Sequence, residues 1–176
     1  MADTAVLGLI LDQIIGRWGN FMNREAFGGY TDGLFAMQLP MEAVRKSDIS
    51  ADIAAHIVEG ANYIQVHPTF LYESALNFLL LLVLWFYRKH KKFDGDMMLI
   101  YLGGYGIIRF FVEGLRTDQL QIGSTGIAVS QMLGIGLFVL SLGTQIIVRA
   151  AMKNGLKQRD PLAQESAGKE TPPENK

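Results

Sequence analysis

The chain has 176 residues, 49% of them hydrophobic, and a formal net charge of -1. This charge argues against nucleic acid as the main partner, because there is no excess of Lys and Arg to neutralise phosphates. The sequence contains no cysteine, which excludes structural disulfides, thiolate zinc sites and covalent catalysis by an enzyme thiol.

The first apolar run, residues 5–15, is about half as long as the roughly 20 residues that cross a bilayer as a helix. Asp12 and Gln13 interrupt it, and Asp12 places an uncompensated acid among apolar residues. We therefore expect the run to be the remnant of a membrane helix or a re-entrant piece. A remnant would mean that the sequence begins inside a larger fold.

A polar, glycine-rich segment follows at residues 16–28, GRWGNFMNREAFG. Its Arg17, Asn20 and Glu25 offer a guanidinium, an amide and a carboxylate, and its glycines allow close approach of the backbone. Such a set suits an anionic headgroup, because Arg grips phosphate with two parallel hydrogen bonds. The alternative is a membrane-edge turn with ordinary caps.

The next stretch, residues 30–69, is mixed in composition, and we expect residues 41–60 to form a surface helix. His67 and Pro68 come at its end, where proline suits the start of a helix. We interpret His67 as a hydrogen-bonding tether, because a lone histidine before a proline is more often a cap or tether than a base. Glu73 is unexpectedly polar for a helix that enters a membrane.

Three apolar stretches are long enough to cross a bilayer, residues 70–87, 97–115 and 127–148. Basic residues gather between the first two and again after the third. Because Lys and Arg mark cytoplasmic loops, we expect these regions and the C-terminus to be cytoplasmic and residues 28–69 to lie outside. The polar tail after residue 157 buries too little apolar surface to order itself.

Arg109 and Glu113 lie inside the second of these spans, four residues apart and therefore on one helix face. A charge near the centre of a span costs at least about 2.5 kcal/mol, so it usually faces a protein interior or a wet cavity. The pair marks either a functional site or a structural ion pair that pins neighbouring helices.

These patterns predict an all-α integral membrane protein. The expected bundle has about three full transmembrane helices, a partial N-terminal helix and an irregular or helical segment on the outer side. The expected parts are residues 1–29 for the partial helix and polar segment, 30–69 for the outer segment, 70–150 for the transmembrane helices and 151–176 for a disordered cytoplasmic tail.

Three segments, GRWGNFMNREAFG, HPTFLYE and YGIIRFFVEGLR, resemble in this order three blocks of the bacterial phosphatidylglycerol–prolipoprotein diacylglyceryl transferase family. The resemblance covers roughly residues 3–145. It implies transfer of the sn-1,2-diacylglyceryl group from phosphatidylglycerol to the lipobox cysteine thiol of a prolipoprotein. The implied setting is the bacterial cytoplasmic membrane, and no metal or cofactor is required.

The resemblance also implies roles for individual residues. The implied substrate-binding residues are Arg17, Asn20, Glu25, Gly28 and Arg109, and the implied catalytic residues are Arg17, Arg109 and Glu113. The arginines would stabilise charge on the departing phosphate ester. Glu113 would orient Arg109, and Glu25 would orient Arg17 or a substrate hydroxyl. Phosphatidylglycerol, the prolipoprotein signal peptide and the lipid bilayer are the expected partners.

Members of this family begin with further membrane helices that carry a tyrosine and a functionally important histidine, which have no counterpart in this sequence. We therefore expect a C-terminal portion that lacks its thiol base and has an N-terminal half as a partner. Two other classes remain open. One is a small transporter or channel subunit with Arg109 and Glu113 along a polar path, and the other is a noncatalytic membrane fragment.

Overall fold

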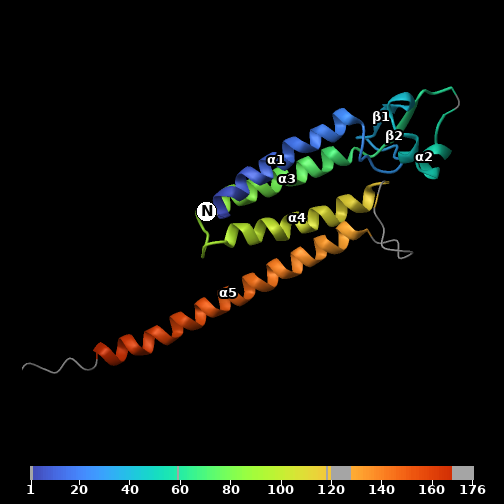
Figure 1. Ribbon diagram of the computed structural model, residues 1–176. Helices are drawn as coiled ribbons and strands as arrows, with labels where there is room; N and C mark the ends of the chain where they lie inside the picture. Colours follow the sequence, from blue (N-terminus) through green and yellow to red (C-terminus); the bar gives the residue numbers. More distant parts are fainter. Residues whose placement is uncertain (1, 59, 118, 120–127, 168–176) are drawn as a thin grey trace, which may run out of the picture.

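A computed structural model of the chain describes residues 2–58, 60–117, 119 and 128–167. Within these residues, four long helices form a bundle that carries a small head at one end (Figure 1). Helices α1 (Ala2–Asn23) and α3 (Thr69–Tyr87) pack along each other, and α4 (Asp96–Leu115) packs against both. Helix α5 (Val129–Ala167) packs against α4 and extends beyond the bundle at the end opposite the head.

Three of these helices are long and apolar enough to cross a membrane, namely α3, α4 and residues Val129–Asn154 of α5. They confirm the three predicted spans. Many of their large apolar side chains are exposed, as is expected of helices whose outer surface meets lipid tails. The predicted class, a helical membrane bundle, is therefore confirmed, and the described part adds only one small antiparallel sheet.

Helix α1 is longer than the apolar run at residues 5–15 suggests. Its 22 residues continue through the polar segment to Asn23, so residues 16–23 are helical and do not form a membrane-edge turn. An existing helix is extended without the cost of a new nucleus, and it would measure about 33 Å at 1.5 Å per residue. Asp12 lies on the exposed side of this helix.

The head is formed by residues 24–58 and 60–68 and differs from the predicted surface helix. Strands β1 (Met37–Pro40) and β2 (Tyr63–Val66) pair antiparallel, with Met37 opposite Val66. The single helix expected over residues 41–60 is wrong. The described residues there form three short pieces, η1 (Met41–Ala43), η2 (Lys46–Asp48) and α2 (Ala51–Ala55).

Extended backbone at Val44 and Ile49 ends the first two of these pieces. Ser50 then starts α2, because its side chain accepts a hydrogen bond from Ile53 N at 3.3 Å. The buried apolar side chains of the head come from both strands, from these turns and from the segment after α1. They are Phe27, Leu39, Val44, Ile53, Ile64 and Val66.

Helices α4 and α5 approach each other closely where Gly106 faces Gly134. A Cβ atom on either glycine would collide with the backbone oxygen of the other. Small residues at such crossings let helix backbones pack tightly in membranes. Ser141 adds a hydrogen bond across the same pair of helices, from its Oγ to the oxygen of Leu99 at 2.6 Å.

Asp96 joins three elements at the end of the bundle opposite the head. It is fully buried, and its carboxylate accepts hydrogen bonds from Tyr87 Oη at 2.7 Å, Lys92 N at 3.1 Å and Arg149 Nη2 at 3.2 Å. The bonds link the end of α3, the loop that follows it and α5. A buried carboxylate with this many donors holds the three elements in register.

Asp3 of α1 lies at the same end and caps α4. Its carboxylate accepts hydrogen bonds from Gly95 N at 3.1 Å and Met98 N at 3.3 Å, which are amides at the start of α4 that have no partner within the helix. Hydrogen bonds from Lys91 to Asp94 and Asp3 raise the pKa of Lys91, which lies in the loop between α3 and α4. These contacts fix α1 against α4.

The tail is more regular than its composition predicts. The backbone of α5 is helical as far as Ala167, so the disorder expected over residues 151–176 is wrong for residues 151–167. A polar segment that continues an existing helix adds one hydrogen bond for each residue it orders, which explains the difference. The rest of the predicted tail, residues 168–176, lies outside the described residues.

Asn77 provides a test of how the bundle interior is stabilised. It is fully buried on α3, and neither its Nδ2 nor its Oδ1 has a hydrogen-bond partner among the described residues. A buried unpaired amide costs roughly 1–3 kcal/mol, so we expect Asn77→Leu to raise the free energy of unfolding by about 1–2 kcal/mol. The measurement is thermal unfolding in detergent.

The matched control is Ser74→Ala on the same helix. Ser74 is buried but donates a hydrogen bond to the oxygen of Ile14 at 3.2 Å, so its removal is expected to lower stability. A loss of stability in Asn77→Leu would instead show that the amide has a partner outside the described residues.

Candidate functional site

Charged residues from three helices meet around Glu73 of α3, which is 2% exposed. Its Oε1 lies 3.1 Å from Nε of Arg17 on α1 and 3.9 Å from Nη1 of Arg109 on α4. Nη2 of Arg109 lies 2.9 Å from Oε2 of Glu113, one turn further along α4. Arg17, Glu73, Arg109 and Glu113 form what we call the arginine cluster.

The two kinds of side chain in the arginine cluster differ in exposure. The side chains of Arg17 and Arg109 are 22% and 23% exposed, whereas those of Glu73 and Glu113 are 3% and 6% exposed. The buried carboxylates are tolerated because they are paired with cations. A guanidinium carries five N–H donors, so each arginine can be held by a carboxylate on one edge and bind an anion with another.

A cavity of about 380 Å³ adjoins the arginine cluster. Its lining is polar at Arg17 and Arg109 and mainly apolar along α5. The lining residues are Arg17, Tyr105, Arg109, Ser130, Leu133, Gly134 and Leu137. Mixed lining of this kind, with a few polar groups converging on an apolar cavity, is typical of small-molecule sites.

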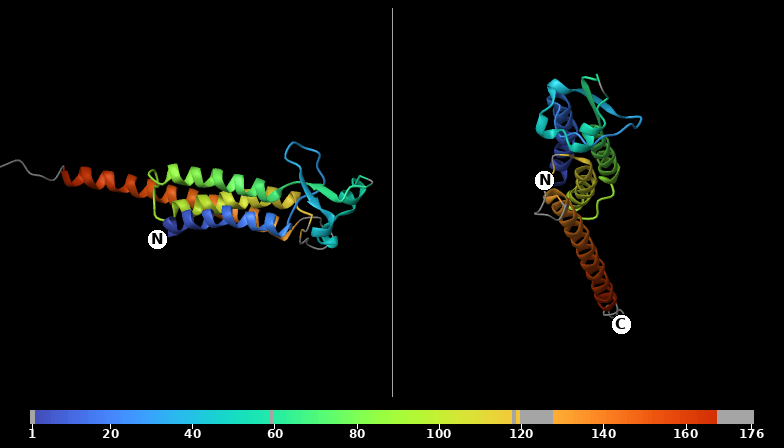
Figure 2. Two further views of the ribbon diagram at one scale, coloured as in Figure 1. Left: turned by 90° about the horizontal axis from the view of Figure 1, so that it is seen from above. Right: turned by 90° about the vertical axis from the view of Figure 1, so that its right-hand side faces the viewer.

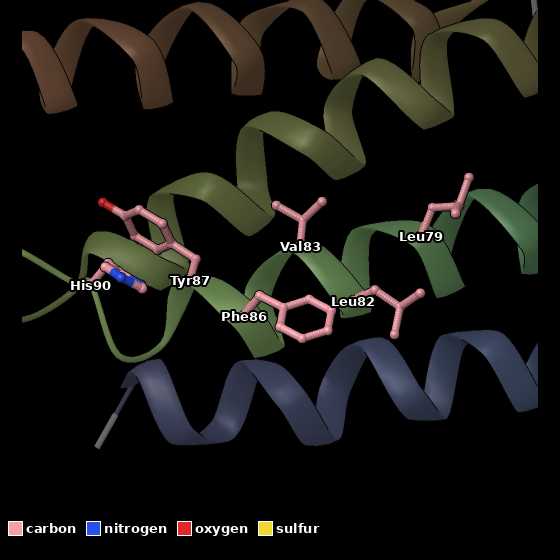
Figure 3. A pocket seen from close by; sticks show the side chains of 6 residues that line it. All are labelled: Leu79, Leu82, Val83, Phe86, Tyr87 and His90. Atoms are coloured by element: carbon pink, nitrogen blue, oxygen red, sulfur yellow. The ribbon is translucent and has the colours of Figure 1, made fainter.

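A larger hollow of about 560 Å³ lies along α3 toward the end opposite the head. Figure 3 shows the side chains that line it, which are Leu79, Leu82, Val83, Phe86, Tyr87 and His90. Its large apolar side chains are exposed, with Phe86 at 71%. We interpret this hollow as a lipid-facing surface, because no cluster of charged side chains lines it.

Tyr105 and Glu73 were missed as site residues by the sequence analysis. Tyr105 precedes Arg109 by four residues and shares its helix face, a spacing that places both side chains on the cavity. The signal for Glu73 was its unexpected polarity in a membrane helix. Its partners could not be named from the sequence, because they lie on two other helices.

Glu25 does not orient Arg17, so that part of the expectation is wrong. Helix α1 ends at Asn23, and Arg24 follows with a φ of 55° that turns the chain toward the head. Glu25 Oε1 accepts a hydrogen bond from Asn23 Nδ2 at 3.1 Å, and Glu25 Oε2 lies 3.6 Å from Nη2 of Arg45. Whether Glu25 holds a substrate hydroxyl stays a prediction.

Asn20 and Gly28 take part in the backbone around the end of α1. The oxygen of Asn20 accepts a hydrogen bond from Glu25 N at 3.0 Å, and the Asn20 side chain is half-buried. Gly28 N donates to the oxygen of His67 at 3.0 Å, and Gly29 N donates to the oxygen of Leu115 at 3.1 Å. Gly28 therefore joins the end of α1 to the start of α3 and the end of α4.

The packing at Gly28 leaves no room for a side chain. A Cβ atom there would lie 2.7 Å from both the Cβ of His67 and the oxygen of Leu115. His67 also places Nδ1 3.2 Å from Tyr72 Oη. These contacts support the interpretation of His67 as a tether.

Replacing Glu73 tests whether it positions both arginines. Glu73→Gln keeps the shape of the side chain but removes the charge shared by Arg17 and Arg109. We expect the free energy of unfolding to fall by about 2–3 kcal/mol, at or below the low end for breaking a buried ion pair, because both arginines keep some exposure. Thermal unfolding in detergent measures the change.

The control for Glu73→Gln is Asp94→Asn. The side chain of Asp94 is 99% exposed and pairs with Lys91 at 2.9 Å, so its neutralisation is expected to leave the unfolding temperature unchanged. Equal stability of the Glu73→Gln variant and the unsubstituted chain would show that Glu73 does not hold the cluster together.

Comparison with known proteins agrees with the three blocks found in the sequence. The profile of the family described as prolipoprotein diacylglyceryl transferase matches residues 1–147. The chain belongs to the prolipoprotein diacylglyceryl transferase family. Its membrane helices and its relatives make it a multi-pass membrane protein of bacterial type.

Several curated relatives within the diacylglyceryl transferase family are similar to the chain. The phosphatidylglycerol–prolipoprotein diacylglyceryl transferase of Clostridioides difficile is 43% identical over 136 residues, which cover 77% of this chain and 46% of the relative. The enzyme of the same name from Finegoldia magna is 41% identical over 147 residues, 83% of this chain and 50% of the relative. That of Bacillus cereus is 43% identical over 152 residues, 86% of this chain and 52% of the relative.

The chain thus spans about half the length of the diacylglyceryl transferases that it matches. No solved structure matches it significantly. The family confirms the resemblance seen in the sequence, while the roles of the individual site residues remain predictions.

Proposed function

We propose that this chain supplies the phosphate-binding part of a phosphatidylglycerol–prolipoprotein diacylglyceryl transferase. The observation that carries the proposal is the meeting of Arg17 and Arg109, from separate helices, on one cavity beside the buried Glu73. A structural ion pair that only pins neighbouring helices together needs no cavity. Two guanidinium groups on one cavity suit the phosphate ester of a lipid.

In the proposed reaction, the lipobox sulfur attacks the diacylglyceryl carbon that bears the phosphate ester. A C–S bond forms, the C–O bond breaks and sn-glycerol 1-phosphate leaves. Arg17 and Arg109 stabilise the negative charge that develops on the departing phosphate, which is the largest contribution a site can make to such a displacement. The thiol proton passes to a base for which we assign no residue of this chain.

Glu73 and Glu113 act in this scheme by holding the arginines in place. Positioning groups of this kind fix the geometry of the residues that touch the substrate. The apolar side of the cavity, Leu133 and Leu137 on α5, suits the glyceride end of the lipid. Asn20 and Glu25, at the end of α1, are proposed to contact polar groups of the substrate near the head.

The proposed orientation places the head outside and the C-terminus in the cytoplasm. The loop between α3 and α4 lies at the end of the bundle opposite the head (Figure 1), and it carries the basic residues 88–92. Basic loops favour the cytoplasmic side. The proposed partners are phosphatidylglycerol, the prolipoprotein signal peptide and a segment equivalent to the remaining half of the relatives.

The test is transfer from phosphatidylglycerol to a lipobox peptide, followed as the gain in peptide mass. The purified chain is assayed in liposomes, alone and after co-expression with the remaining half of the Clostridioides difficile relative. A peptide with serine in place of the cysteine and liposomes of phosphatidylethanolamine are the controls. The proposal predicts a product in at least one of the two arms. This product should form only when the peptide carries the cysteine thiol and the liposomes contain phosphatidylglycerol.

Two results would contradict the proposed function. One is the absence of any product in both arms although the chain is folded, which would favour a noncatalytic fragment. The other is salt-dependent ion flux across the same liposomes without lipid transfer, which would favour a transporter or channel subunit.

A further inference from the structure

The head exposes two neighbouring apolar side chains at the tip of a loop. Leu34 is 94% exposed and Phe35 is 63% exposed. Most other large apolar side chains of the head are buried or half-buried in its core. Single exposed apolar residues are common, but a pair presented together on a loop tip indicates a contact surface.

The loop that carries this pair is ordered by hydrogen bonds. Ala36 N donates to the oxygen of Gly33 at 2.9 Å, which makes residues 33–36 a tight turn with Leu34 and Phe35 at its centre. We call these four residues the apolar turn. One flank of the loop is fixed because Gln65 Nε2 donates to the oxygen of Thr31 at 2.8 Å. The other flank continues directly into β1.

The position of the loop relates it to the membrane. Figure 2 shows the loop before β1 standing out sideways from the bundle, beside the ends of the helices nearest the head. Because α3 and α4 are long enough to cross a bilayer, their ends at the head mark the level of the membrane surface. A tip that projects sideways at this level meets lipid headgroups and the upper part of the acyl chains.

We propose that the apolar turn is an interfacial anchor that inserts Leu34 and Phe35 into the bilayer leaflet on the head side. Two side chains on a convex tip present little area, whereas a specific protein interface needs about 800 Å² from each partner. Shallow insertion into a leaflet needs no more than a small apolar surface. The anchor would hold the head at a fixed tilt above the bundle, whether or not the chain transfers lipid.

The sequence around the apolar turn indicates whether its insertion should depend on the charge of the lipid headgroups. Residues 30–36 contain no Lys or Arg, and Asp32 is the only charge among them. Insertion therefore depends on apolar contact and not on attraction to anionic headgroups. We expect it to be equally strong in liposomes of neutral phosphatidylcholine and in liposomes that contain phosphatidylglycerol.

The absence of cysteine from the chain makes a direct test possible. Leu34→Cys and, separately, Phe35→Cys are labelled with an environment-sensitive fluorophore, and each full chain is reconstituted in phosphatidylcholine liposomes. The control is Asn62→Cys. Asn62 is exposed and belongs to the segment between α2 and β2, at the end of the head farthest from the bundle (Figure 1).

The anchor predicts that the labels at positions 34 and 35 emit at shorter wavelength and several-fold more brightly than the label at position 62. It also predicts that nitroxide-bearing lipids quench the first two labels only. Water-like emission at positions 34 and 35 would overturn the proposal. So would a shift that occurs only after a lipobox peptide is added, because that result would assign the turn to the protein substrate.

Discussion

Replacing Arg109 by alanine is expected to lower the rate of diacylglyceryl transfer by about 10²–10³-fold, the usual cost of removing one donor that stabilises developing charge. Arg109 is the residue of the arginine cluster that pairs with Glu113 at 2.9 Å while also lining the cavity. Without it, the phosphate faces one guanidinium instead of two. The measurement is the initial rate of phosphatidylglycerol-dependent transfer to a lipobox peptide, in whichever arm of the assay is active.

Arg149→Ala is the matched control for this experiment. Arg149 is also a membrane-helix arginine whose Nη2 lies 3.2 Å from a buried carboxylate, that of Asp96. It lies at the end of the bundle opposite the head, away from the cavity. Its loss is expected to reduce stability but leave the rate for each folded molecule nearly unchanged. Equal losses of rate in the two variants would show that Arg109 acts through stability alone.

Gly28→Ala is expected to lower the free energy of unfolding markedly, even though it adds a single methyl group. The new Cβ atom would lie 2.7 Å from the Cβ of His67 and 2.7 Å from the oxygen of Leu115. Neither neighbour is the free end of a flexible side chain, so the backbone itself must move. Overpacking of this kind costs about 1–3 kcal/mol and occasionally more.

The measurement for Gly28→Ala is thermal unfolding in detergent, with Gly29→Ala as its control. Gly29 is adjacent, but a Cβ atom there would meet nothing within 4 Å. We expect Gly29→Ala to change stability by no more than about 0.5 kcal/mol. An unfolding temperature for Gly28→Ala as high as that of Gly29→Ala would contradict this prediction. It would mean that His67 and Leu115 can move apart at little cost to make room for the methyl group.

The membrane helices could be predicted from the sequence because one local property defines them. A span needs about 20 consecutive apolar residues, and α3, α4 and the first part of α5 each satisfy this requirement. The proximity of Arg109 and Glu113 was equally local, since residues four apart on a helix are always neighbours. Helix α1 was underestimated because Asp12, Gln13 and the polar segment interrupt its apolar run.

The parts that could not be predicted depend on residues far apart in the chain. Arg17 meets Glu73 only because α1 and α3 pack along each other, which no spacing within either helix reveals. The strands of the head are four residues each and pair across a long connection, so their pattern is too short to stand out. Glu25 pairs with Arg45 and not with the expected Arg17, because the chain turns at Arg24 after the end of α1.

The central claim is that Arg17 and Arg109 act as one site on one phosphate, and a double-mutant cycle tests it most directly. Transfer rates are measured for the unsubstituted chain, Arg17→Lys, Arg109→Lys and the double variant, because lysine keeps the charge and leaves a measurable rate. The account predicts that the double variant is less impaired than the product of the two single losses, by at least about 0.5 kcal/mol of coupling. Losses that simply multiply would show that the two arginines act at separate places and would contradict the account.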